Sequence, residues 1–260
     1  MIKKAAKRAF PRLYQFLSHR IGHPARYMRV AAAVVERYGR KVNEGPFTGM
    51  IYGDMAAGSA YTPKILGTYE LELRPWIEQV IQENYAAIID LGCAEGYYAV
   101  GLAVRCPNAV IYAFDGDPLA RGACQELATL NGVENRIHIG GYCDAEIMKT
   151  LPLEKAMLIC DVEGSEFELL DPELLPVLTT IDIIVELHEL LRPGVTATLL
   201  NRFTPTHDIT LIDAVERDAT LFPQVHFLPP AGQHLALTES RAEGQQFARF
   251  TVRHSAPPAP

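Results

Sequence analysis

The chain has 260 residues, of which 48% are hydrophobic, so it can bury a sizeable core as one large domain or as one domain with an appendage. No uncharged apolar run reaches the roughly eighteen residues of a membrane-spanning helix, and the basic start lacks the apolar stretch of a secretory signal. We therefore expect a cytoplasmic protein without a transmembrane segment. The five cysteines show no CxxC spacing, which excludes a zinc-ribbon or disulfide scaffold and favours reduced, packed thiols.

The net charge of −7 is unevenly distributed. Residues 1–41 carry eleven of the 24 Lys and Arg residues and one acid, Glu36, whereas the rest of the chain is acidic. A basic helical arm could contact a membrane surface, a nucleic acid, or the acidic body of its own or a neighbouring subunit, in which case it would join a homodimer. We favour a solvated or subunit-packing extension. Nucleic acid is not favoured, because the acidic body has no clear phosphate-binding stripe.

In chain order, helical spacing first predicts two helices, over residues 3–19 and 25–38, separated by a break that contains Gly and Pro. Residues 43–66 are rich in Gly and Pro and predict an ordered loop or lid rather than a core element. Helical spacing returns over 69–84. The expected divisions are a basic helical extension (1–45), a lid with a connecting helix (46–82), the main domain (83–254) and a flexible tail (255–260).

Five short, apolar segments with β-branched residues follow, and helix-like segments alternate with most of them. This pattern implies right-handed crossovers and a doubly wound, mostly parallel sheet. Two further strand-like segments, 209–215 and 247–252, have no convincing helix between them and predict an antiparallel edge pair. The expected fold is therefore α/β and Rossmann-like, with seven strands. The five parallel strands are predicted at 86–91, 109–114, 136–139, 155–160 and 181–187, and the helices at 96–105, 118–131 and 163–178.

The turn after the first strand is the main candidate for ligand binding, because open parallel sheets bind ligands beyond the carboxyl ends of their strands. Gly92 permits a sharp turn there, and Gly96 lets the next helix start near the ligand, where its first amides can receive an anionic group such as a carboxylate. The turn is not the dinucleotide pattern GxGxxG, and acids at Asp90 and Glu95 would repel a pyrophosphate. S-adenosylmethionine, which has a sulfonium and an ammonium group beside its carboxylate, fits better. The predicted cofactor contacts in this turn are Asp90, Gly92, Cys93, Ala94, Glu95, Gly96 and Tyr97.

A second acidic turn ends the next strand. Asp115 lies 25 residues after the first acid of the cofactor turn, near the spacing at which Rossmann-like folds bind ribose hydroxyls. Its carboxylate can accept two hydroxyl hydrogen bonds. Gly116 and Asp117 complete this turn and are predicted to contact the cofactor with it. After the third strand, Cys143 and Asp144 are predicted to form a wall for the adenine, with Asp144 as an acceptor for its amino group.

With these motifs, the sequence over about residues 67–252 resembles the FkbM-type branch of class I S-adenosylmethionine-dependent methyltransferases. The resemblance implies methyl transfer, commonly to a hydroxyl of a sugar, a polyketide or another small metabolite. It also implies that Glu70 binds the ammonium group of the cofactor. The family's Asp-x-Glu-Gly-x-Glu cluster is the most specific part, and it is matched by Asp161, Glu163, Gly164 and Glu166. The stretches that carry the resemblance are IIDLGCAEGYYAVGLA (88–103), YAFDGDP (112–118) and LICDVEGSEFELL (158–170), with IIVELHE (183–189) in support.

Methylation of a hydroxyl requires an in-line acceptor and a group that takes up its proton. Candidates after the fourth and fifth strands are Asp161, Glu163 and His188; the histidine is attractive because its ordinary pKa is roughly 6.5, and Glu163 is its competitor. Asp161, Glu186 and His188 could alternatively hold a divalent ion that acidifies the hydroxyl. No metal is favoured: we expect Asp161 to hydrogen-bond the cofactor or substrate and Glu186 to pair with a base such as Arg192.

Three other functions are compatible with parts of the pattern. A non-catalytic module could bind S-adenosylmethionine or S-adenosylhomocysteine and recruit a partner through the basic arm. A nicotinamide dehydrogenase could use a similar sheet, but the acidic turn and the missing Tyr-x-x-x-Lys pair argue against it. A nucleic-acid methyltransferase would use the basic arm for binding.

Overall fold

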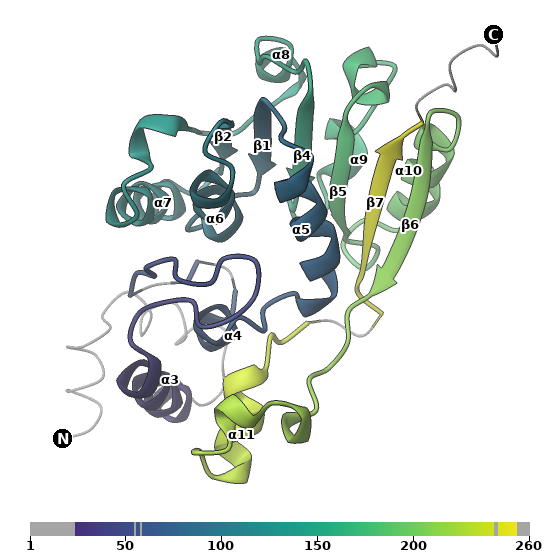
Figure 1. The fold of residues 1–260 in the computed structure, drawn as a ribbon. Coiled ribbons are helices and arrows are strands. Elements are labelled where there is room, and N and C mark those ends of the chain that lie inside the picture. Colours follow the sequence, from purple (N-terminus) through teal and green to yellow (C-terminus); the bar gives the residue numbers. More distant parts are fainter. Residues whose placement is uncertain (1–23, 55, 58, 242–243, 254–260) are drawn as a thin grey trace, which may run out of the picture.

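The computed structural model shows an α/β protein with helices on both faces of one sheet (Figure 1). The predicted helix over residues 3–19 and the tail 255–260 lie outside the described residues, so the contact made by the basic arm stays a prediction. The model describes four stretches of the chain: residues 24–54, 56–57, 59–241 and 244–253.

The sheet has seven strands in the order β3-β2-β1-β4-β5-β7-β6. Strands β1 to β5 are parallel, and β7 lies antiparallel between β5 and β6, so the predicted fold class is confirmed. Leu91 pairs with both Phe114 and Cys160, which places the carboxyl ends of β1, β2 and β4 side by side. The strands are β1 (Ala87–Leu91), β2 (Val110–Phe114), β3 (Ile137–Gly140), β4 (Ala156–Cys160), β5 (Asp182–Leu187), β6 (His207–Asp213) and β7 (Gln246–Val252).

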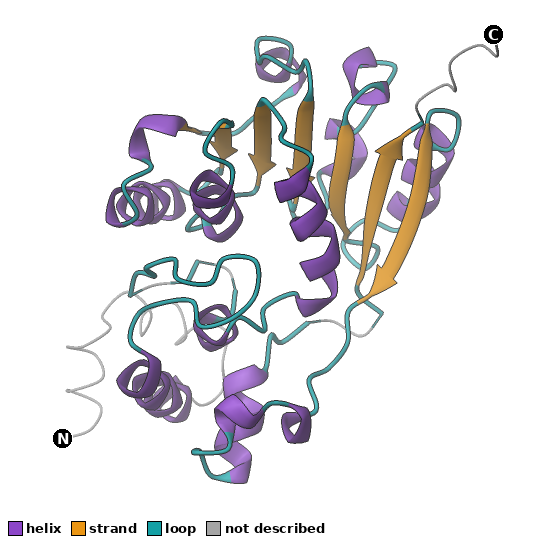
Figure 2. Cartoon of the chain, viewed as in Figure 1, coloured by secondary structure: helices purple, strands orange, loops and turns teal. Residues whose placement is uncertain are grey.

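The two faces of the sheet bury separate hydrophobic clusters. Successive side chains of a strand point to opposite faces, so Ile88 joins the cluster beneath α5, α6 and α7, whereas Ile89 joins the cluster beneath α9 and α10 (Figures 1 and 2). Burial on both faces explains why β1 and β4 are apolar along nearly their whole length. The covering helices are α5 (Arg74–Gln82), α6 (Tyr97–Arg105), α7 (Pro118–Leu130), α8 (Ala145–Met148), α9 (Glu166–Leu169) and α10 (Val195–Phe203).

Three further helices form a cap below the carboxyl ends of the parallel strands (Figure 1). They are α3 (Pro24–Tyr38), α4 (Tyr61–Leu66) and α11 (Pro230–Leu237), and they pack on one another. The expectation that residues 43–66 are a loop or lid outside the core is wrong. Phe47, Tyr52 and Tyr61 are buried in the larger hydrophobic cluster, where each large apolar side chain contributes roughly 1.5–3 kcal/mol.

The helices of the second half differ most from the prediction. The predicted helix over 163–178 is divided into α9 and the short 3-10 helix Pro176–Thr179, because Pro172 and Pro176 cannot lie in a helix interior. Helix α10 was not predicted. The expectation of no helix between the last two strands is wrong as well, since α11 lies between β6 and β7.

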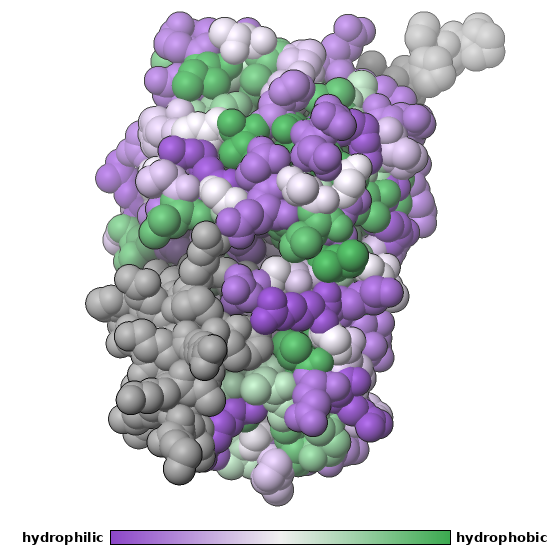
Figure 3. Space-filling view, turned by 90° about the vertical axis from the view of Figure 1, so that its left-hand side faces the viewer, coloured by the Kyte–Doolittle hydropathy of each residue, from purple (hydrophilic) through white to green (hydrophobic). Residues whose placement is uncertain are grey.

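The hydropathy of the surface and the state of the cysteines can be compared with what the sequence predicts. Figure 3 shows hydrophilic side chains over much of one face, with smaller hydrophobic areas between them. Within the described part of the chain, no helix is long and apolar enough to cross a membrane. All five cysteines are free and buried, which confirms the prediction of reduced, packed thiols.

Candidate functional site

A cavity of about 660 Å³ lies at the carboxyl ends of β1, β2, β4 and β5. Its walls come from the turns after these strands, from the cap between Ala57 and Lys64, and from the segment that ends at Arg241 before β7. This is the edge at which open parallel sheets bind ligands. The cavity lies within the 300–1,000 Å³ range that is usual for small-molecule sites.

Gly92 brings three strand ends together. Its amide donates to the carbonyl oxygen of Phe114 at 2.8 Å, and the amide of Asp161 donates to the carbonyl oxygen of Leu91 at 2.8 Å. A Cβ atom at Gly92 would lie 1.7 Å from the carbonyl oxygen of Asp161, and its φ is +82°. Only glycine therefore fits this turn, as the sequence predicted.

Asp115 is held rigidly at the edge of the cavity. One carboxylate oxygen accepts from the amide of Ala94 at 2.9 Å and the other from the amide of Asp117 at 2.7 Å. Asp117 in turn caps α7 by accepting from the amide of Leu119 at 2.9 Å. A carboxylate has about four acceptor positions. Asp115 therefore joins the first two turns and keeps capacity for two ribose hydroxyls.

Asp90 is the most buried acid of the cavity wall. Within the described part of the chain its Oδ2 atom has no hydrogen-bond partner. Burial, together with the charge of Asp161, raises the pKa of Asp90 to about 7. Leaving a buried acceptor unsatisfied costs about 1–3 kcal/mol. A positively charged or hydrogen-bond-donating ligand would remove this cost, so the wall fits S-adenosylmethionine.

Most of the predicted cofactor residues line the cavity, and five do not. The carboxylate of Glu95 points to the cap, where it accepts from the Tyr52 hydroxyl and from the Ala57 amide at 2.7 Å and pairs with Lys64. Asp144 caps α8 through a 2.9 Å hydrogen bond from a backbone amide. Contact of these five with a cofactor stays a prediction. The lining residues are Glu70, Asp90, Gly92, Cys93, Ala94, Tyr97, Asp115, Asp117 and Asp161, and the five others are Glu95, Gly96, Gly116, Cys143 and Asp144.

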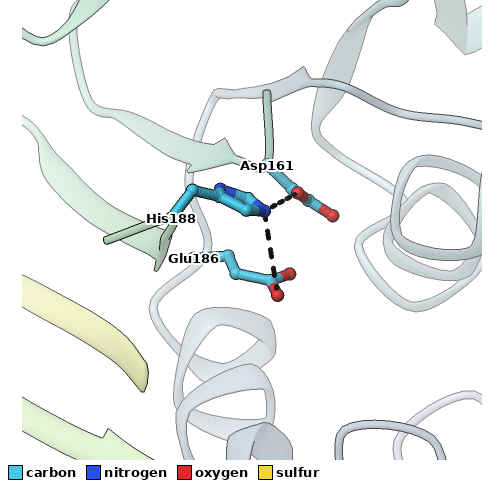
Figure 4. Close-up of side chains that lie close together, drawn as sticks. All are labelled: Asp161, Glu186 and His188. Carbon is cyan, nitrogen blue, oxygen red and sulfur yellow. Dashed lines mark ion pairs between the residues drawn. The ribbon is translucent and has the colours of Figure 1, made fainter. Parts of the chain in front are cut away.

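The three candidate catalytic residues meet after β4 and β5. His188 Nδ1 lies 2.6 Å from Oε1 of the fully buried Glu166, while its Nε2 lies 3.6 Å from Asp161, 3.7 Å from Glu163 and 3.9 Å from Glu186. Figure 4 shows the ring directed at Asp161 and Glu186. Burial alone would lower the pKa of His188, but the hydrogen bond to Glu166 and the surrounding carboxylates raise it to about 9. The ring is therefore protonated near neutral pH.

The carboxylates around this ring carry raised pKa values. Burial and the charge of Glu70 raise the pKa of Asp161 to about 6, and burial and the charge of Asp161 raise that of Glu186 to about 9. One ligand atom from each of Asp161, Glu186 and His188 lies within 4.8 Å of the others, so the set could hold a metal ion. A protonated His188 would supply positive charge at the same place. The metal site stays a prediction.

Arg241 was not predicted as part of the site. It pairs with Glu70, with Glu186 at 2.7 Å and with Glu239 at 3.1 Å. The expected partner of Glu186 was wrong, because Arg192 instead pairs with Glu168 at 2.9 Å. Such a network of buried charges is costly to assemble unless all members are paired.

The acid expected to hold the ammonium group also belongs to this network. Glu70 accepts from the Tyr98 hydroxyl as well as from Arg241, and it lines the cavity. Glu70, Ala94 and Glu163 all have left-handed backbone conformations, with φ of 45°, 49° and 53°. Each such residue costs of order 1–3 kcal/mol and is typical of functional sites. Ser240, with a φ of 57°, is a fourth residue of this kind in the cavity wall, and such strain supports a ligand-binding role.

The sheet order and topology are those of a Rossmann-like fold, and two solved structures share it. Cofactor-bound Rv0187 from MTB is similar over 93% of this chain and 96% of its own, with a TM-score of 0.52 and 13% identity. The METTL16 methyltransferase domain is similar over 89% of this chain and 81% of its own, with a TM-score of 0.51 and 11% identity. No protein-family model matches the chain, and no curated protein matches its sequence.

Proposed function

We propose that the protein is an S-adenosylmethionine-dependent methyltransferase, similar to the FkbM-type branch, that methylates a hydroxyl of a small molecule such as a sugar, a polyketide or another secondary metabolite. One observation carries this proposal: Asp90, Asp115 and Asp161 bring carboxylates from three adjacent strand ends to one cavity. An acidic cavity suits a cationic nucleoside better than a dinucleotide. The cofactor supplies an activated methyl group.

The nucleoside side of the site is assigned to the first two turns. Asp115 binds the two ribose hydroxyls, because both its oxygens are already oriented by backbone amides. The sulfonium of the ligand would favour the charged form of Asp90, whose pKa is raised to about 7 and whose Oδ2 has no hydrogen-bond partner in the described part of the chain. These fixed groups need no reorganisation when the ligand enters, which favours binding.

The acceptor side is assigned to the turns after β4 and β5. A protonated His188 cannot accept a proton, so Asp161 is assigned as the proton acceptor, with Glu163 as the alternative. His188 then acts as a cation 3.6 Å from Asp161 that holds this carboxylate in place. Leu190 and Leu191 line the same cavity and are 71% and 60% exposed, so they offer an apolar surface to the body of the acceptor.

Calorimetry with S-adenosylhomocysteine tests the assignment directly. The wild-type protein is expected to bind it, and Asp115→Ala is expected to weaken binding at least about tenfold, because hydrogen bonds to a charged group contribute about 1.5–3 kcal/mol. Asp208→Ala is the control, since Asp208 on β6 is an exposed acid that pairs with Arg253. Absence of binding to both S-adenosylmethionine and S-adenosylhomocysteine would contradict the proposal.

A second measurement separates an enzyme from a silent binding module. Cell extracts supplied with labelled cofactor should yield a methylated small molecule with the wild-type protein. The double variant Asp161→Asn with Glu163→Gln is expected to bind cofactor more weakly, because Asp161 lines the cofactor cavity, and to form little product even when cofactor is saturating. Tight binding of cofactor without any product from a broad set of extracts would favour the non-catalytic module with its basic arm.

A further inference from the structure

Lys64 is a buried cation in the wall of the cavity. It belongs to α4 and is 2% exposed. Its ammonium group pairs with Glu95, lies 2.6 Å from the Ser59 hydroxyl oxygen, and sits over the rings of Tyr69 and Tyr97 at 4.6 and 5.3 Å. A charge is held in such a place only when it is paired and hydrogen-bonded.

The ammonium group of Lys64 retains one donor for a ligand. A lysine has three N–H donors, and the hydrogen bonds to Ser59 and Glu95 use two of them in the described part of the chain. Glu95 divides its charge among several donors, because it also accepts from the Tyr52 hydroxyl and the Ala57 amide. These donors occupy further acceptor positions of Glu95 and leave the third N–H of Lys64 without a partner in the described part of the chain.

The other cations of the cavity are surrounded by acids. Among the described lining residues these cations are Arg241 and His188. Arg241 contacts three carboxylates, and His188 has four within 4.0 Å. Lys64 pairs with a single carboxylate. A ligand carboxylate that enters this acidic cavity is therefore least repelled at the Lys64 wall.

We propose that Lys64, with the Ser59 hydroxyl, binds the α-carboxylate of the cofactor. The proposal rests on the function proposed above and assigns the binding site of the cofactor's amino acid end. The nucleoside meets Asp115, the methyl group faces Asp161, and the amino acid end lies against α4. Glu70 follows Tyr69 in the chain and is then near enough to this end to meet the ammonium group.

The test compares two ligands that differ only in the carboxylate: S-adenosylmethionine and decarboxylated S-adenosylmethionine. Calorimetry gives the ratio of their dissociation constants for each protein. The double variant Lys64→Met with Glu95→Gln removes both buried charges together, so that no unpaired Glu95 is left. In the wild type, S-adenosylmethionine should bind more tightly than the decarboxylated ligand. In the double variant, this preference should fall about 10- to 100-fold.

The control is Lys149→Met with Glu146→Gln, which makes the same change in an exposed ion pair on α8 and should leave the ratio unchanged. If the Lys64 double variant melts as a folded protein and keeps the wild-type ratio, the proposal is wrong. If the wild type binds neither ligand nor S-adenosylhomocysteine, the proposed function itself fails.

Discussion

The protonation state of His188 decides which side chain can take up the proton in the proposed reaction. Glu166 fixes one nitrogen, and three carboxylates surround the other at 3.6–3.9 Å. A histidine in water titrates near pH 6.5, but this arrangement keeps the ring charged up to about pH 9. We therefore propose that the base of the reaction is one of the carboxylates.

The pH dependence of turnover identifies that base. Asp161 has a pKa raised to about 6, so it is ionised above that pH and loses its ability to accept a proton as the pH falls through 6. We expect kcat to fall on the acidic side with a midpoint near pH 6. Asp161→Asn should lower kcat by about 100-fold or more and remove this limb.

Glu163→Gln serves as the control for this profile, because Glu163 is the more exposed of the two acids. It should retain the limb near pH 6 if Asp161 is the base. A limb that persists in Asp161→Asn and disappears in Glu163→Gln would reverse the assignment.

Single residues also mark the limit of what the sequence could predict in the site. Asp90 lies near the end of β1, and Asp115 and Asp161 directly follow β2 and β4, so their convergence was predictable from the rule that parallel strand ends share one edge. Lys64 and Arg241 come from segments without such a pattern, one in a Gly- and Pro-rich stretch and one before the last strand. Their positions depend on how the cap packs, which local sequence does not encode.

At the scale of secondary-structure elements, the turn after β1 is the tightest junction. Gly92→Ala would place a methyl group 1.7 Å from the carbonyl oxygen of Asp161 at a φ of +82°. We expect it to lower the free energy of unfolding by about 3 kcal/mol or more. Chemical denaturation checks this value.

Gly122→Ala is the matched substitution. Gly122 lies exposed in α7, where a Cβ atom would meet nothing within 4 Å. Alanine is favoured over glycine in helices by about 1 kcal/mol, so this variant should be slightly more stable than the wild type. Equal effects of the two alanines would show that the strand ends can separate to admit a side chain.

The start of β6 depends on the neutral form of His207. This fully buried ring lies 3.0 Å from the carbonyl oxygen of Ile181 and 2.8 Å from the Thr206 hydroxyl, and burial lowers its pKa below 6.5. The unfolded chain thus binds the proton more readily than the folded chain. The stability from His207 is complete above about pH 6.5 and is lost as the pH falls towards the folded-state pKa.

Denaturant unfolding of the wild type and His207→Gln at several pH values between 7.5 and 5 checks this prediction. The difference in unfolding free energy between the two proteins should shrink as the pH falls, because only the wild type pays to keep a neutral imidazole. Taking the difference removes the contributions of the site residues. A difference that grows at low pH would show that the ring is charged in the folded state.

The parallel strands were predicted correctly from the sequence, whereas helices α10 and α11 were not, and the difference has a physical reason. Strands β1 and β4 are buried along their whole length and β5 along nearly all of it, which makes them short apolar runs that are easy to find. Helix α11 begins with a proline and contains Gly232, and α10 is rich in β-branched residues, so both have weak helix propensity. Their formation depends on packing: α11 buries Ala236 and Leu237, and α10 buries Leu199 and Phe203.

At the scale of the whole molecule, the cavity joins parts of the chain that are far apart. Residues 57–64, 90–97 and 235–241 contribute to its walls. A bound ligand should therefore slow amide hydrogen exchange in all three segments together, because it stabilises only the folded state in which these segments surround the cavity. Exchange measured with and without S-adenosylhomocysteine checks this.

Strand β6 provides the internal reference for that experiment, since its residues lie outside the cavity wall. Its exchange should change little at partial saturation, beyond the effect of global stability. Protection limited to residues 90–97 would mean that the ligand does not contact the cap.

The position of α11 has a consequence for engineering the protein. It is inserted between two neighbouring antiparallel strands, whose seven paired positions fix their register without it. Replacing α11 alone with a segment from another protein would nevertheless expose the surfaces of α3 and α4, because α11 packs on both helices. A chimera that exchanges the cap should therefore transplant α3, α4 and α11 as one unit, which means replacing two separate segments of the chain while leaving the sheet intact.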